Sequence, residues 1–189
     1  MSTATLEQHR TGASFVGFAA WIAMAGAVLQ FVLGIPLAYL QAETPPSAAI
    51  VALNILHHLL LMVGIVGLAR SQAAGGGWLG KGGLSLSQLG FALLVVAEAS
   101  WLFSTSATET LFGLATLVLL LGLILAGIAV VRAGRWKGWH RFTPLACGVF
   151  IAVVVLPSFA LPGYASNYAI GLWGVCWFLL GLSLLAEAR

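Results

Sequence analysis

Two adjacent histidines in an apolar stretch, His57 and His58, are the residues of this chain best suited to chemistry. Asn54 precedes His58 by one helical turn, so an α-helix places these two side chains on one face with His57 beside them. Imidazoles inside a membrane protein can bind protons, metals or polar ligands, and they turn away from lipid. The sequence therefore predicts a polar helix face that is buried within the protein.

Glu98 is the one acidic residue well inside a long apolar stretch. A carboxylate at that depth costs about 2.5–3.5 kcal/mol on insertion scales, so it must be protonated, paired or placed at a polar cavity. At about 1.5 Å per helical residue, Glu98 lies at the depth of Asn54 and within side-chain reach of the histidines. We expect Glu98 to hydrogen-bond with Asn54 or a histidine, and Gln30 of the first apolar stretch could extend the cluster.

Several kinds of site fit these residues. A cavity that binds or moves a small molecule or protons is one, because ionisable groups inside membrane spans often mark substrate paths or proton relays. Haem or chlorophyll, bound through His57 or His58, is another, although no other span has a histidine at comparable depth for a second axial ligand. A zinc ion bound by these histidines and Glu98 is disfavoured, since neighbouring helical residues diverge by about 100°.

The polar residues could instead brace two helices, with hydrogen bonds worth about 0.6–2 kcal/mol each in membranes. A second class of function is then an accessory subunit of a larger membrane complex, favoured by the short loops and by seven Trp and ten Phe. Enzyme signatures such as GxSxG, HExxH and a Walker loop are absent from the sequence, as is aspartate. We therefore assign no catalytic residue and do not expect an enzyme.

The composition indicates an integral membrane protein. Of 189 residues, 61% are hydrophobic and 7% are charged, whereas soluble domains carry about 25% charged residues. With about 20 apolar residues required for each crossing, the chain divides into six helices. We expect a single all-α domain with six transmembrane spans at about 15–40, 48–69, 84–103, 111–131, 142–161 and 168–186.

The basic residues predict the orientation of these spans. All eight Lys and Arg flank the same ends of the spans, while the connections after spans one, three and five contain none. Because Lys and Arg in short loops stay in the cytoplasm, both termini are predicted to be cytoplasmic in a cell membrane. The basic residues that give the net charge of +3 therefore serve to orient the spans, and no nucleic-acid partner is expected.

One basic connection, 132–141, also contains two tryptophans, Trp136 and Trp139. Such a mixture suits the interface, where indole rings lie among headgroups and cations meet anionic phosphates. We expect one of these rings at the inner headgroup level and mainly an anchoring role for the connection. Its candidate headgroup ligands are Arg132, Arg135, Lys137 and Arg141.

Small residues and prolines predict how the spans pack. Stripes of Gly and Ala in spans one, four and six allow another backbone to approach closely. The approaching helix could belong to this chain, to a partner protein or to a second copy. The stripe in span one also puts Gln30 at a helix contact. Pro36 and Pro157 should interrupt spans one and five and widen the outer half of the bundle. The Gly-rich stretch 71–83 is predicted to be a flexible loop.

Overall fold

The computed structural model describes residues 3–36, 47–103, 105–162 and 164–188, and they form an all-α bundle. Six helical stretches are long and apolar enough to cross a membrane, which confirms the predicted architecture. The end of the first predicted span, 37–40, lies outside the described residues. The main helices are α1 (Thr3–Gly34), α2 (Ala48–Arg70), α3 (Trp78–Ser100), α4 (Thr105–Ala133), α5 (Thr143–Phe150), α6 (Leu156–Ser158) and α7 (Ala165–Glu187).

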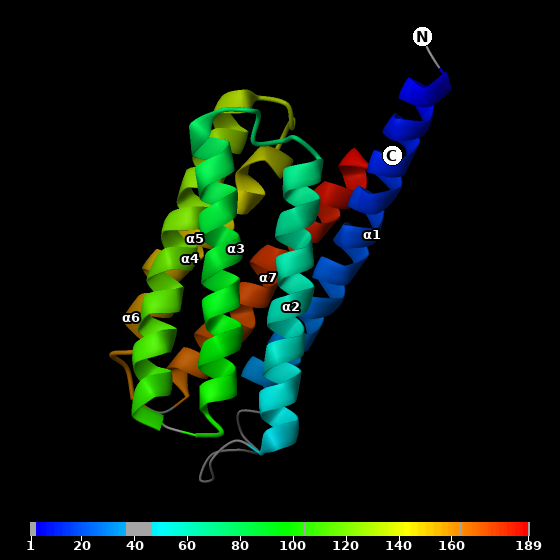
Figure 1. Ribbon diagram of the computed structural model, residues 1–189. Helices are drawn as coiled ribbons and strands as arrows, with labels where there is room; N and C mark the ends of the chain where they lie inside the picture. Colours follow the sequence, from blue (N-terminus) through cyan, green and yellow to red (C-terminus); the bar gives the residue numbers. More distant parts are fainter. Residues whose placement is uncertain (1–2, 37–46, 104, 163, 189) are drawn as a thin grey trace.

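The chain crosses the bundle six times, so both termini lie at the same end (Figure 1). The α2–α3 and α4–α5 connections lie at that end too, and they contain or adjoin the described basic side chains. The outside of the bundle is apolar: Trp21 is 63% exposed and Val153 66% exposed. A bilayer would cover these side chains, so the chain is a multi-pass membrane protein.

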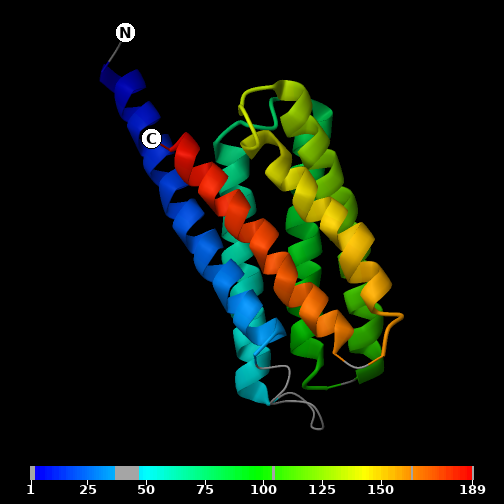
Figure 2. The ribbon, with the colours of Figure 1, turned by 180° about the vertical axis from the view of Figure 1, so that it is seen from behind.

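Two helix pairs approach each other closely along small residues. α1 lies beside α7, and α3 lies beside α4 (Figures 1 and 2). A Cβ added at Gly174 of α7 would lie 2.6 Å from the carbonyl oxygen of Ala27 in α1, and one added at Gly90 of α3 would lie 2.7 Å from Cα of Leu119 in α4. The predicted seams in spans one, four and six are therefore real helix contacts.

The third helix begins earlier than the sequence predicts. α3 starts at Trp78, not at Leu84, so the second half of the Gly-rich stretch is helical and the prediction of a loop up to residue 83 is wrong. Gly80 faces the carbonyl oxygen of Ala74, and Gly83 faces the backbone of α4. This close packing offsets the low helix propensity of glycine.

The two prolines act differently from each other. α1 ends at Gly34, two residues before Pro36, and the rest of the predicted first span, 37–40, lies outside the described residues. Proline disfavours the helical conformation in the residue before it, which helps to end the helix. Pro157 does lie within span five, after the π-helical segment Ile151–Val155, where the Leu156 N–H donates to the Ile151 carbonyl. The wider π turn adjusts the hydrogen bonding next to a residue that has no N–H.

Candidate functional site

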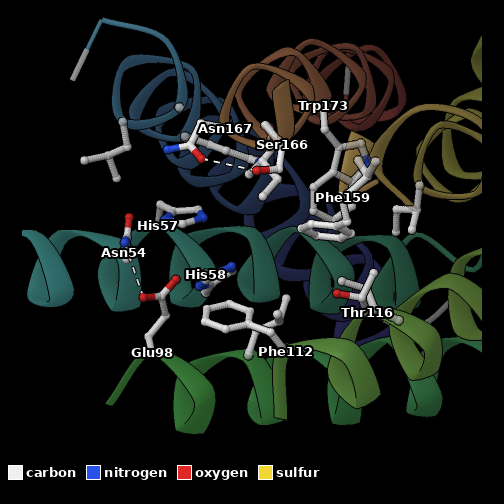
Figure 3. Close-up of a pocket in the computed structure, with 18 of the residues that line it drawn as sticks. Asn54, His57, His58, Glu98, Phe112, Thr116, Phe159, Ser166, Asn167 and Trp173 are labelled. Carbon is white, nitrogen blue, oxygen red and sulfur yellow. Dashed lines mark hydrogen bonds between the residues drawn. The ribbon is translucent and has the colours of Figure 1, made fainter. Parts of the chain in front are cut away.

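A cavity of about 690 Å³ lies among the spans, in the half of the bundle away from the termini. All six spans contribute to its wall. The wall includes every residue of the predicted polar cluster: Gln30, Asn54, His57, His58 and Glu98 (Figure 3). Polar residues from three separate spans, which the sequence predicted to form one cluster, therefore line the same cavity.

Glu98 meets the polar face of α2 as predicted. The Asn54 side chain donates from Nδ2 to Oε2 of Glu98 over 3.2 Å. α2 begins at the end of the bundle where α3 ends, so the first half of α2 and the last turns of α3 lie at the same depth. Glu98 is only 5% exposed, and its other carboxylate oxygen turns toward His58 (Figure 3).

The histidines lie beside this pair without joining it. Both rings are buried, with centroids 3.9 Å apart and planes tilted by 38°. Neither nitrogen of His57, nor Nδ1 of His58, has a hydrogen-bond partner in the described part of the chain. The Leu53 carbonyl lies close to His57 but does not form a hydrogen bond of regular geometry. Of the partners predicted for Glu98, Asn54 is the one that donates a hydrogen bond to it.

Gln30 lies at a helix contact, as predicted, but its partner is in α7. Its Nε2 donates to the carbonyl oxygen of Ile170 over 2.9 Å, and the residue is 1% exposed. Its Oε1 is buried without a hydrogen-bond partner among the described residues. Gln30 thus connects α1 to α7 at the wall of the cavity and does not hydrogen-bond with Glu98.

Much of the wall was not predicted from the sequence. One face of α4 contributes Glu109, Phe112, Thr116 and Leu119. Their spacing follows the helical period, and Thr116 is a polar residue in an apolar run, which is the signal that could have revealed this face. The sequence placed Glu109 in a connection, whereas it belongs to α4.

The cavity extends from the end of the bundle to the buried histidines. Three lining residues at that end, Glu109, Phe159 and Asn167, are exposed. Tyr164 and Asn167 also line the cavity, whereas Tyr168 is not part of the lining. Neither proline lines it, although the neighbouring Gly34 and Val155 do.

A metal ion finds no ligand set in the described part of the chain. No three His, Cys, Asp or Glu side chains come together there in a way that could hold a metal ion. The two free cysteines, Cys147 and Cys176, do not enlarge the polar cluster, because neither lines the cavity. The zinc arrangement considered from His57, His58 and Glu98 is therefore not formed.

The basic connection packs on the opposite end of the bundle. Arg135 donates from Nη1 to the carbonyl oxygen of Gln72 over 2.8 Å, which ties this connection to the one between α2 and α3. Trp136 is only 2% exposed, so it is a core residue and not an interfacial one, whereas Trp139 is 49% exposed. Headgroup contact by Trp139 and by the four cations stays a prediction.

Comparison with known proteins adds no family to this description. No family model matches the chain, and no curated protein or solved structure is significantly similar to it. The function must therefore be argued from the cavity.

Proposed function

We propose that this membrane protein binds or moves a small molecule or protons in the cavity between its six spans. The observation that supports this most directly is His57, which is 3% exposed, lines the cavity and has no hydrogen-bond partner for either ring nitrogen in the described part of the chain. Buried polar groups are normally hydrogen-bonded, and an exception calls for a ligand, an ion or water. The cavity provides the space for one.

The volume of the cavity favours this function over a purely structural role. A polar brace between two helices needs no adjoining space, and its side chains would be enclosed by others. Here a space of about 690 Å³ adjoins the Asn54–Glu98 bond, which is within the range of about 300–1,000 Å³ typical of small-molecule sites. Apolar walls with a few polar groups are also typical of such sites.

The charge distribution supports an orientation in which the mouth of the cavity lies outside the cytoplasm. The described Lys and Arg side chains lie at the end of the bundle opposite the mouth, and the positive-inside rule assigns that end to the cytoplasm. We therefore propose that the ligand enters from the outer face of a cell membrane.

Cysteine labelling from outside tests this proposal. Thr116→Cys places a thiol on the cavity wall, and Val96→Cys places one on the exposed, lipid-facing side of α3 as a control. A membrane-impermeant maleimide added to intact cells should label Thr116→Cys much faster than Val96→Cys. The parent protein measures any reaction of Cys147 and Cys176. Equal, slow labelling of both variants would indicate that the polar residues are enclosed and only connect helices. Labelling from the cytoplasmic side alone would show that the orientation is the opposite of the proposed one.

A further inference from the structure

We propose that the ligand of this cavity is a monovalent organic cation with an aromatic or apolar body. This inference rests on the proposed function and adds the chemical class of the ligand. It follows from the sign of the charges on the cavity wall, from the arrangement of Glu98, and from the aromatic side chains that surround the space.

The charges on the wall are of one sign. Among the described lining residues, the acidic side chains are Glu98, deep in the cavity, and Glu109, exposed at its mouth, and none of these residues is Lys or Arg. The connections at this end, 35–47, 101–107 and 159–167, contain no Lys or Arg in the sequence. A cleft lined by one sign of charge attracts the opposite sign and raises its local concentration. The cavity therefore favours cations at its mouth and at its inner end.

Among the described residues, Glu98 has no positively charged partner. The hydrogen bond it receives in the described part of the chain comes from Asn54, a neutral amide, and no Lys or Arg lines the cavity with it. A buried carboxylate is stable when it is paired with a cation or loses its charge. A ligand cation entering the cavity would supply the missing charge, because Glu98 lines the cavity and its carboxylate oxygen not bonded to Asn54 turns toward His58, another lining residue (Figure 3).

Aromatic rings form much of the remaining wall. The described lining includes Trp101, Phe112, Phe159, Tyr164 and Trp173. The indole of Trp173 is held in place, because its Nε1 donates to the Cys147 carbonyl over 2.9 Å and its ring packs edge-on against Trp177 with centroids 5.4 Å apart. Aromatic faces attract organic cations, and a ring that is already fixed loses little entropy on binding. The wall thus suits an organic cation better than a hydrated inorganic one.

Anionic ligands and haem fit this wall poorly. Haem carries two carboxylates, and no Lys or Arg among the described lining residues could pair with them. The nearby Glu98 would repel them as well. His57 and His58 have free ring nitrogens, but the surroundings have the wrong sign for an acidic cofactor. The same reasoning excludes carboxylate and phosphate ligands.

Calorimetric titration of the purified protein in phosphatidylcholine nanodiscs tests the class of ligand. The probes are tetraphenylphosphonium and benzyltrimethylammonium, and tetraphenylborate is an anion of nearly the same shape as the first. Empty nanodiscs correct for partition into lipid. We expect saturable binding of at least one cation, weakened about 10- to 100-fold by Glu98→Gln, since the loss of one charge-assisted contact has that effect. Glu98→Gln keeps an acceptor for Asn54, and Glu187→Gln at the other end should leave binding unchanged.

Two further variants, with one control variant, separate failure of the ligand class from failure of the site. Gly113→Trp places a large ring at the cavity wall, because Gly113 lines the cavity and a Cβ there meets nothing within 4 Å, and by obstructing the space it should abolish binding of the cations. Phe112→Leu removes one aromatic face and should weaken binding about 2- to 30-fold, whereas Phe103→Leu, which does not line the cavity, should have no effect.

The possible outcomes distinguish failure of the proposed cation class from failure of the proposed cavity function. Saturable binding of tetraphenylborate that Gly113→Trp abolishes and Glu98→Gln leaves unchanged would overturn the cation class while supporting a small-molecule cavity. Absence of saturable binding by both cations, or cation binding that Glu98→Gln does not change, would also overturn the inference. Cysteine labelling at position 116 would then decide the proposed function separately.

Discussion

Asn54 and Glu98, 44 positions apart in the chain, meet at 3.2 Å across the interface of α2 and α3. The amide of Asn54 donates to one oxygen of a buried carboxylate, and both residues line the cavity. The pair therefore belongs both to the helix packing and to the candidate site. Because the pair takes part in both, substitutions at Asn54 and Glu98 can measure how much the polar cluster contributes to stability.

A double-mutant cycle of Asn54→Ala and Glu98→Ala should give a coupling of about 0.6–1.7 kcal/mol, the range found for hydrogen bonds between membrane helices. The free energy of unfolding, measured by detergent denaturation of the parent, the two single variants and the double variant, provides this value. Additive effects of the two substitutions would show that the hydrogen bond contributes nothing to stability.

Gly90→Ala should destabilise the protein by about 1–3 kcal/mol, the usual effect of overpacking a close contact. The added Cβ would lie 2.7 Å from Cα of Leu119, and backbone cannot move aside as a side-chain end can. Gly82→Ala in the same helix is the matched control, because a Cβ there meets nothing within 4 Å. Thermal unfolding of the two variants would contradict the packing of α3 on α4 if both midpoints shifted equally.

A reporter enzyme that is active only outside the cytoplasm should be inactive when it is fused to the C-terminus. The expectation follows from the basic residues, all of which flank the ends of the spans on that side. The same reporter placed in the 159–167 connection should be active. High activity of the C-terminal fusion would invert the orientation and put the mouth of the cavity in the cytoplasm.

Neutralising Arg132, Arg135, Lys137 and Arg141 together should weaken the orientation of the protein or its binding to anionic lipid. Each basic residue near an anionic surface contributes about 1 kcal/mol. Flotation with vesicles that contain anionic lipid measures the second effect, and the reporter fusion measures the first. If neither changes, the connection is neither an anchor nor a lipid site.

Protein extracted in mild detergent should be colourless and free of stoichiometric partners. The acidic wall of the cavity disfavours haem, and a ligand site within one chain needs no second subunit. An absorption spectrum together with size-exclusion chromatography is the measurement. A pigment band, or a partner protein present in equal amount, would favour the accessory-subunit function instead.

The sequence by itself determined the number of spans, the end at which its basic residues gather, and the depth of each polar residue. These properties depend on local composition and on the constant rise of a helix, which apply to each span separately. Because α2 and α3 follow each other in the chain, depth alone was also enough to predict the contact between Asn54 and Glu98.

Only the tertiary structure decided which faces of distant spans meet. The aromatic wall combines residues of α4 and α7 with residues that directly follow α3 and α6 or precede α7, and the sequence contains no local signal for that combination. The early start of α3 at Trp78 and the burial of Trp136 likewise depend on contacts with other segments. The hydrophobic effect does not select among apolar faces in lipid, so close packing of small residues decides which helices become neighbours.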